Sequence, residues 1–348
     1  MKLLIAASGT GGHLFPALAL AEQLKDYNIE WLGVPNRLEQ SLVPQCYPLH
    51  AVPIEGFQER FGLKTLKILG RFVASVFQVR KLLKELKIDA VVTTGGYIAA
   101  PAILAARLEK IPAILHESNF LPGKVTRFLS PFCHTVALGF EGAAEYLPRA
   151  RTVYVNTPVR SQFRSHANLD LPIPSDAFLI VVVGGSQGAV AINQLVRQCA
   201  RTWLSSEDVF IVHLTGDRDE EANSFQHPQY LTMPFYENMA GLLQRANLAI
   251  SRAGAGTLTE LAVTSTPAIL IPYPYAAEDH QNYNAEVFGA AGGAIVFRQS
   301  ELTASILENE VSKLLRSPLE LEKMTAATAS LAVTDSAERL ADLVRAIV

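Results

Sequence analysis

The stretch FLIVVVGGSQGA at residues 178–189 joins an apolar run to a glycine-rich turn, and a helical pattern follows over residues 191–201. A continuous apolar run, without alternation, indicates a strand that is covered on both faces of a parallel sheet. The beginning of the chain repeats this form. There, the apolar run Lys2–Ala7 leads into SGTGG at residues 8–12 and then into a helix that we expect over residues 16–24. The sequence therefore predicts two doubly wound α/β domains.

Further strands and helices alternate outward from these two starting points. The expected strands cover residues 2–7, 30–32, 90–93, 113–115, 135–137, 178–183, 210–214, 248–251, 268–271 and 294–296. The other expected helices cover residues 66–86, 101–108 and 336–347. Asp335, followed three residues later by Glu338, is typical of a cap for the last helix.

The length of 348 residues also favours two domains, at roughly 150 residues each. Residues 149–176 contain several prolines among mixed polar residues, which is typical of a connection between domains. We expect an N-terminal domain over residues 1–158, a C-terminal domain over residues 159–334 and a C-terminal helix over residues 335–348.

Composition excludes several other classes of protein. Hydrophobic residues make up 49% of the chain and charged residues 18%, which excludes a disordered chain. A net charge of -3 gives no field that would attract nucleic acid, so we expect no such partner. Cys46, Cys133 and Cys199 lie far apart, which suits a reducing compartment and fits neither a disulfide scaffold nor a zinc site. The first apolar run is too short for a signal peptide or a membrane span, so we expect a soluble, cytoplasmic protein.

Glycine-rich loops follow strands at residues 8–13, 95–97, 184–188 and 252–260. Backbone N–H groups in such loops, with a helix dipole behind them, can bind a phosphate. The first loop is similar to GxGxxG, but His13 replaces the third glycine and weakens a dinucleotide interpretation. Tight turns alone would explain any single loop. Several loops at the carboxyl ends of parallel strands predict a shared ligand site.

Six motifs occur in the order of a known family. They are GTGGH at residues 9–13, GGY at 95–97, HESN at 116–119, PVR at 158–160, GGSQGA at 184–189 and RAGAGTLTE at 252–260. Together they closely resemble the MurG family of bacterial transferases, in glycosyltransferase family 28, over nearly the whole chain. The resemblance implies a GT-B fold, in which two Rossmann-like domains with parallel sheets face a deep cleft. It also implies inverting transfer of N-acetylglucosamine from UDP-N-acetylglucosamine to the muramyl 4-hydroxyl of undecaprenyl-diphospho-muramyl-pentapeptide. This step converts lipid I to lipid II in peptidoglycan synthesis.

The resemblance implies that the C-terminal domain holds the donor. Glu260 is similar to the carboxylate that pairs with the ribose hydroxyls, and an ionised carboxylate can accept from two adjacent hydroxyls. A plain surface position on a helix is the alternative for Glu260. Arg160 resembles the family arginine near the nucleotide. The remaining donor contacts implied in the RAGAGTLTE motif are Gly254, Ala255, Gly256, Thr257, Leu258 and Thr259.

Other donor contacts are implied outside this loop. Ser186 and Gln187 resemble residues that contact the diphosphate or the sugar. Tyr236 resembles the residue whose backbone meets uracil, and Gln281 the contact to the donor sugar. His280 takes the place of Gln281 if the loop register differs by one residue.

On the N-terminal side, the resemblance implies a site where the acceptor diphosphate and the donor sugar meet. Its implied contacts are Thr10, Gly11, Gly12, Tyr97 and Asn119. Attack by a sugar hydroxyl needs a base, and His13 and Glu117 are the two titratable candidates for this catalytic role. We favour His13 slightly, because it lies beside the proposed phosphate loop. A structural cap or core position is the alternative for His13, and a scaffold role the alternative for Glu117.

The chain departs from the family pattern at Asn156 and Thr157 before PVR, at Ser118 within HESN and at Thr126, where asparagine is common. These departures leave the implied reaction class unchanged. Asp217-Arg218-Asp219 spells an Asp-x-Asp metal motif, but we expect a solvated turn there. We expect neither a metal nor another cofactor.

A basic amphipathic segment between residues 64 and 87 suits a lipid acceptor. Its basic residues are Lys64, Lys67, Arg71, Arg80, Lys81, Lys84 and Lys87, against the single acid Glu85. Apolar residues interleave with them at helical spacing: Leu66, Leu69, Phe72, Val73, Val76 and Phe77. Such a segment can dock on an anionic membrane surface, although an ordinary helix with a core face is the alternative. We expect peripheral attachment to the cytoplasmic face of the inner membrane, with other cell-wall synthesis proteins as candidate partners.

Two other functions compete with this interpretation. One is a related GT-B enzyme, such as a transferase with another lipid acceptor or a nucleotide-sugar 2-epimerase, because the fold alone does not separate them. The other is a catalytically silent protein that binds nucleotide sugars. The presence of His13, Glu117 and Glu260 speaks against a silent protein.

Overall fold

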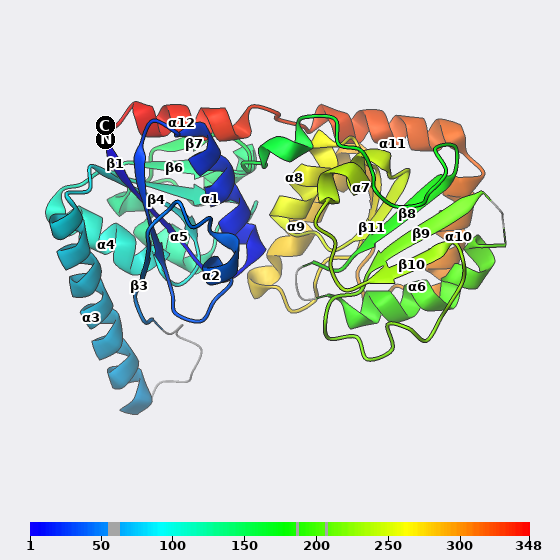
Figure 1. The fold of residues 1–348 in the computed structure, drawn as a ribbon, viewed down its shortest axis with the longest axis horizontal. Helices are drawn as coiled ribbons and strands as arrows, with labels where there is room; N and C mark the ends of the chain where they lie inside the picture. Colours follow the sequence, from blue (N-terminus) through cyan, green and yellow to red (C-terminus); the bar gives the residue numbers. More distant parts are fainter. Residues whose placement is uncertain (55–62, 186–187, 206–207) are drawn as a thin grey trace. The chain divides into compact units, whose positions relative to one another are not determined.

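The computed structural model describes residues 1–54, 63–185, 188–205 and 208–348. The chain divides into two compact units (Figure 1): unit 1 comprises residues 1–160 and 335–348, and unit 2 comprises residues 161–334. The last helix, which we expected as a separate segment, is thus part of unit 1.

In the described part of unit 1, a seven-stranded sheet has the order β3-β2-β1-β4-β5-β6-β7, and every pairing is parallel. Its strands are β1 (Lys2–Ala7), β2 (Asn28–Gly33), β3 (Leu49–Ala51), β4 (Ala90–Gly95), β5 (Ala113–Glu117), β6 (Thr135–Leu138) and β7 (Thr152–Tyr154). Its helices are α1 (Gly11–Gln23), α2 (Glu39–Leu42), α3 (Leu63–Leu86), α4 (Ala99–Glu109), α5 (Lys124–Leu129) and α12 (Ser336–Arg345), with short 3₁₀ turns η1 (Ser130–Phe132) and η2 (Glu141–Tyr146).

Unit 2 contains a six-stranded sheet among its described residues, in the order β10-β9-β8-β11-β12-β13, again with parallel pairings. Its strands are β8 (Phe178–Val183), β9 (Val209–Leu214), β10 (Tyr230–Met233), β11 (Leu248–Ser251), β12 (Ala268–Leu270) and β13 (Ala294–Val296). Its helices are α6 (Val190–Trp203), α7 (Met239–Arg245), α8 (Ala255–Val263), α9 (His280–Ala291), α10 (Ala304–Leu315) and α11 (Pro318–Ser330), with 3₁₀ turns η3 (Ser161–Phe163) and η4 (Ala277–Asp279).

The structure confirms the two parallel-sheet α/β domains and all the expected strands. β3, β7 and β10 were not expected, because these partly exposed edge strands lack the continuous apolar run that marks the other strands. The expected start of the first helix at residue 16 was wrong. The helix begins at Gly11 and contains Pro16, so two glycines that resemble a turn form its first residues.

Helix α12 contributes to the core of unit 1. Leu340, Ala341 and Val344 are buried in the same cluster as Leu14 and Leu20 of α1. The helix begins after Asp335, but the expected side-chain cap is not made. The Asp335 carboxylate instead pairs with Arg339 Nε at 2.9 Å, one turn further along the helix.

Candidate functional site

In unit 1, the loops that follow β1 and β4 meet at His13. The imidazole Nδ1 lies 2.8 Å from the carbonyl oxygen of Thr94, and the Thr94 hydroxyl donates to the His13 carbonyl at 2.7 Å. Gly95 has a φ of +110°, and a Cβ at this position would lie only 2.6 Å from His13 Nδ1. Because a carbonyl only accepts, Nδ1 carries the proton, and Nε2 is the basic nitrogen of the neutral ring.

The first turn of α1 is an anion-binding geometry. Thr10 occupies the N-cap in an extended conformation, and its side chain makes no cap hydrogen bond. Thr10 and Gly12 are exposed, whereas Gly11 is buried. The buried Glu39 carboxylate accepts from Gly9 N at 3.1 Å and from Val34 N at 2.7 Å, which fixes the entry to the loop. The uncapped helix start can therefore receive a phosphate.

Glu117 lies buried at the end of β5, and both of its carboxylate oxygens are used. Oε1 accepts from Asn119 N at 3.0 Å and from Asn119 Nδ2 at 3.1 Å. Oε2 accepts from Gly123 N at 3.2 Å and from Thr126 Oγ1 at 2.6 Å. These contacts hold the turn that leads into α5. The geometry thus favours the scaffold alternative for Glu117, which leaves His13 as the stronger candidate for the base.

The histidine of the HESN motif has a structural role that sequence reasoning missed. His116 is buried, its Nε2 donates to the Asn156 carbonyl at 3.0 Å, and Ser118 Oγ donates to its Nδ1 at 3.3 Å. Burial lowers the pKa of His116 to about 4. Asn156 has a φ of +65° and accepts from Thr157 N at 2.6 Å. The two departures before PVR therefore lie at a turn that His116 braces.

Two other predicted contacts also belong to unit 1. Arg160 was expected in the C-terminal domain, but it is the last residue of the first segment of unit 1, and its Cζ lies 4.1 Å from the centre of the Phe15 ring. Tyr97 is exposed on the loop after β4. Gly96 in this loop has a φ of +83°, and a Cβ there would lie 2.5 Å from the Ser8 carbonyl oxygen. The backbones of the two loops therefore approach each other closely.

In unit 2, the loop after β11 leads directly into α8. Gly254 is the N-cap, with φ −68° and ψ 134°, and as a glycine it supplies no side-chain cap. Gln281 Oε1 accepts from Ala253 N at 3.2 Å and from Tyr273 N at 3.0 Å, so one side chain joins this loop to the segment after β12. An uncapped helix start beside a fixed amide suits a diphosphate and its sugar.

The residues of the RAGAGTLTE motif divide between a buried face and a half-buried face. Leu258 is fully buried, and the buried Thr259 donates to the Ala255 carbonyl at 2.9 Å, so these side chains belong to the fold. Gly256, Thr257 and Glu260 are half-buried. Because residues three or four positions apart share a helix face, Glu260 lies on the same side as Gly256 and Thr257.

Arg252 opens the same motif, and its side chain is a brace. Nη1 donates to the carbonyls of Ile271 and Pro272 at 3.0 and 3.1 Å, and Nη2 donates to Gln299 Oε1 at 2.7 Å. The guanidinium also lies 5.5 Å from the centre of the Tyr273 ring. These contacts place the strand ends of β11 and β12 for the loops that follow.

The other predicted donor contacts are scattered in unit 2. Ser186 and Gln187 lie outside the described residues. Tyr236 lies between β10 and α7, and its hydroxyl donates to the Asp170 carboxylate. His280 Nδ1 donates to the Ala277 carbonyl at 2.8 Å.

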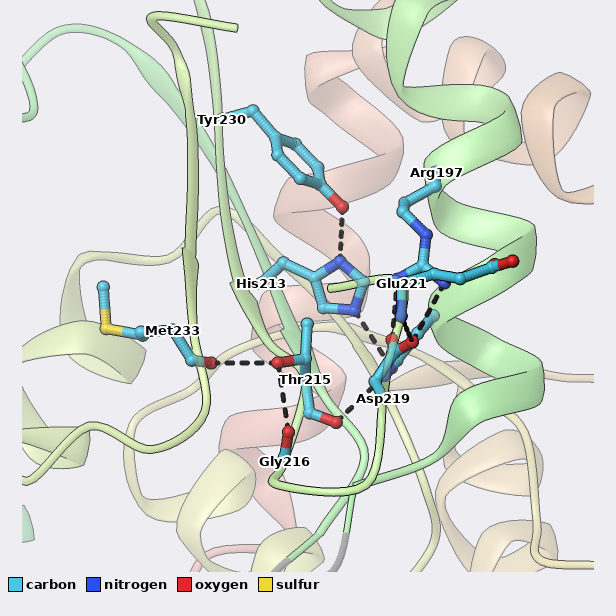
Figure 2. A network of polar contacts seen from close by, with 9 residues as sticks. Arg197, His213, Thr215, Gly216, Asp219, Glu221, Tyr230 and Met233 are labelled. Atoms are coloured by element: carbon cyan, nitrogen blue, oxygen red, sulfur yellow. Dashed lines mark hydrogen bonds and ion pairs between the residues drawn. The ribbon is translucent and has the colours of Figure 1, made fainter. Parts of the chain in front are cut away.

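The expected solvated turn at the Asp-x-Asp motif was wrong for Asp219. This carboxylate is buried, accepts from Arg197 Nη1 at 2.6 Å and Nη2 at 3.2 Å, and accepts from Asn193 Nδ2 at 2.7 Å (Figure 2). Burial opposes ionisation, but the hydrogen bonds from Arg197 and Asn193 outweigh it and lower the pKa of Asp219. The sequence hides this partner, because Arg197 lies 22 residues earlier on α6.

The side chains of α3 are described from residue 68 onward, so Lys64, Leu66 and Lys67 fall outside this description. Phe72 and Val76 pack against the core. A different stripe faces outward: Leu69, Val73 and Phe77, four residues apart, are 48%, 45% and 56% exposed.

The basic residues of α3 are partly neutralised. Arg80 pairs with Glu109, Lys84 Nζ lies 3.3 Å from the same carboxylate, and Lys81 Nζ lies 3.6 Å from Glu85. The apolar stripe is therefore the more distinctive feature of this helix. Throughout the described ranges, no helix is both long and apolar enough to cross a bilayer.

Comparison with known proteins places both units in one family. The glycosyltransferase family 28 N-terminal domain matches residues 3–138, and the family 28 C-terminal domain matches residues 179–340. A protein of Gloeothece citriformis is 71% identical over 99% of this chain and 96% of its own length. It is named UDP-N-acetylglucosamine–N-acetylmuramyl-(pentapeptide) pyrophosphoryl-undecaprenol N-acetylglucosamine transferase. A protein of the same name from Synechocystis is 63% identical over 100% of this chain and 98% of its own.

Solved structures agree with these matches. The crystal structure of Acinetobacter baumannii MurG has a TM-score of 0.79 at 29% identity and covers 99% of each chain. A UDP-GlcNAc 2-epimerase from Neisseria meningitidis, bound to UDP-GlcNAc, has a TM-score of 0.69 and covers 99% of this chain and 100% of its own. Its identity of 13% shows a shared fold alone. With both of its units matched by the family's two domain models, the chain belongs to glycosyltransferase family 28.

Proposed function

We propose that this chain transfers N-acetylglucosamine from UDP-N-acetylglucosamine to the muramyl 4-hydroxyl of lipid I, which produces lipid II and UDP. The observation that carries the proposal is the 71% identity, over 99% of the chain, to a transferase named for this reaction. The uncapped helix starts in both units and the fixed tautomer of His13 support it.

In this proposal, unit 2 holds the donor. The start of α8 faces the diphosphate with backbone N–H groups, and Glu260, one turn later on a half-buried face, accepts from the ribose hydroxyls. Gln281 is held by its oxygen between two loops, so its amide nitrogen is the group that can donate to the sugar. The backbone around Tyr236 and the residues Ser186 and Gln187 complete the proposed donor contacts.

Unit 1 supplies the base in this proposal. His13 Nε2 takes the proton of the muramyl 4-hydroxyl, whose oxygen forms a bond to the anomeric carbon of the donor sugar as the bond to the diphosphate breaks. Attack from the face opposite the leaving group inverts the anomeric centre. Backbone N–H groups at the helix starts stabilise the charge on the departing UDP. Glu117 acts through the turn that it holds, by its hydrogen bonds from Asn119 and Thr126.

We further propose that unit 1 attaches peripherally to the cytoplasmic face of the inner membrane. The exposed stripe Leu69, Val73 and Phe77 on α3 supports this proposal, and so do Val125 and Phe128 on α5, which are 49% and 75% exposed. Apolar side chains that enter the lipid boundary supply binding free energy in proportion to the buried area. A surface of this kind would bring the enzyme to its lipid-linked acceptor.

Turnover tests the proposed function directly. The purified protein would be incubated with UDP-N-acetylglucosamine and a lipid I analogue, and the products followed by mass spectrometry. Gain of one N-acetylhexosamine on the acceptor, with release of UDP, is the expected result. Saturable donor binding without any product on this acceptor would contradict it and favour the silent binding protein. Conversion of the donor without transfer would favour the epimerase.

A further inference from the structure

Unit 2 contains a run of buried polar side chains that takes no part in the proposed chemistry. It extends from Tyr230 on β10 through His213 on β9 to Asn193 on α6, and then to Asp219 and Arg197 (Figure 2). We call these five residues the polar chain. Tyr230 is 5% exposed, His213 and Asn193 are 0% exposed, and Asp219 and Arg197 are each 8% exposed. Such a buried network is stable only when every member has a partner.

The hydrogen bonds of the polar chain determine the position of each proton. Asn193 Nδ2 lies 2.7 Å from Asp219 Oδ2 and 2.9 Å from the Thr215 carbonyl, and both of these groups accept. Asn193 Oδ1 must therefore accept from His213 Nε2, which lies 3.0 Å away. His213 Nδ1 then carries the lone pair and accepts from the Tyr230 hydroxyl at 2.5 Å. The polar chain therefore has one position for each proton, with the neutral His213 ring protonated on Nε2.

Through Thr215, the polar chain reaches Gly188, the last glycine before α6. A Cβ at Gly188 would lie 2.2 Å from the Thr215 carbonyl oxygen and 3.0 Å from Gly216 Cα, and Gly188 has a φ of +73°. The same carbonyl accepts from Asn193, and Gly216 N of the same peptide donates to the Pro234 carbonyl at 3.1 Å. The peptide that packs against Gly188 is therefore held on both sides.

We propose that Asn193 and His213 are positioning residues for the donor site. Through the Thr215 carbonyl they fix Gly188 and the start of α6, so that the backbone there meets the diphosphate of the nucleotide sugar in one orientation. The inference rests on the proposed function, in which backbone N–H groups at helix starts meet the donor diphosphate. The ion pair between Arg197 and Asp219 serves the same end, because Asp219 holds the amide nitrogen of Asn193 in place.

Steady-state kinetics with UDP-N-acetylglucosamine and a lipid I analogue test the inference. Asn193→Ala and His213→Leu are expected to raise the KM for the donor by about tenfold or more, while kcat changes by less than about threefold. His213→Gln places an amide nitrogen where Nε2 lies, keeps the donor to Asn193, and should hold the donor KM within about threefold of wild type. Tyr230→Phe removes a single hydroxyl and supplies a mild variant should the others fail to fold.

Thr328→Val is the matched control. Thr328 is also fully buried in unit 2, and its hydroxyl donates to the carbonyls of Gly293 and Met324, outside the polar chain. It should lower the melting temperature and leave the donor KM unchanged. An unchanged donor KM in folded Asn193→Ala would overturn the inference. So would equal changes in donor KM, kcat and melting temperature in Asn193→Ala and Thr328→Val.

Calorimetric titration with UDP separates this inference from the proposed function. If the wild type binds UDP but transfers no sugar, the proposed function fails. The inference still stands if Asn193→Ala weakens UDP binding by about tenfold while Thr328→Val does not. If the wild type binds no UDP, both fail.

Discussion

The two units share one order over six strands, with a seventh in unit 1, but use a histidine at the carboxyl edge of the sheet in different ways. In unit 1, half-buried His13 in the first turn of α1 contacts the backbone of Thr94 through Nδ1, which makes Nε2 the basic nitrogen. In unit 2, His213 is fully buried, and both ring nitrogens are bonded to side chains. Both rings lie near the carboxyl ends of parallel strands, where ligands bind in open α/β sheets. Exposure and hydrogen bonding then decide whether the ring can exchange a proton with a substrate or only holds a loop.

The difference predicts that His13→Ala causes the largest change. Loss of a general base should lower kcat by about a hundredfold to ten-thousandfold, whereas UDP affinity should stay within about threefold. Comparison with His213→Leu sharpens the contrast, because that variant should change the donor KM instead. Equal losses of UDP affinity in both variants would contradict the separate roles of base for His13 and positioning residue for His213.

Glu260→Ala should have the next largest effect. Its removal leaves the ribose hydroxyls without their acceptor, which costs about 1–3 kcal/mol and weakens UDP binding about tenfold to a hundredfold. Glu117→Gln in unit 1 is the comparison, since it should disturb the turn before α5 and leave UDP binding unchanged. Isothermal titration with UDP measures both. Full affinity in Glu260→Ala would remove Glu260 from the donor site.

Acid should destabilise both units through their buried histidines. Burial lowers the pKa of His116 and of His213 from 6.5 to about 4, so each unfolded ring binds a proton that the folded ring does not. The stability is therefore complete above pH 6.5 and falls between pH 6.5 and pH 4, by about 2 kcal/mol per histidine at pH 5. His116→Gln and His213→Gln should each flatten the dependence of the melting temperature on pH over this range. If neither substitution changed the slope of melting temperature against pH, the two histidines would not be the source of the acid sensitivity.

A smaller effect is expected on membrane binding, which should depend on the exposed stripe of unit 1 and not on unit 2. Phe77→Glu in the exposed stripe of unit 1 should reduce co-sedimentation with vesicles of anionic phospholipid by about tenfold, because a buried phenylalanine contributes about 1.5–3 kcal/mol. Ile306→Glu in unit 2 is the matched control, since Ile306 is 38% exposed on α10. It should leave vesicle binding unchanged. An equal loss in the two variants would place the membrane surface elsewhere.

The sequence predicted the central strands well and the polar contacts poorly. β1, β8 and β11 have the bounds that their apolar runs indicate, because a strand covered on both faces needs such a run. His13 was identifiable from its glycine motif. Its tautomer was not, because it depends on Thr94, 81 residues away. The buried state of Asp219 likewise depends on a contact with Arg197 that no local pattern contains.

The position of α12 has a consequence for the order in which the chain acquires its structure during synthesis. Residues 161–334 are made as one continuous stretch, so all of the residues of unit 2 emerge from the ribosome before residues 335–348. The first unit to leave the ribosome lacks Leu340, Ala341 and Val344 until the last residues emerge, so its core closes last. Purified chains truncated after residue 334 should then resist protease over unit 2 and remain open to it over unit 1. The earliest part of the protein to be translated would be the latest to mature.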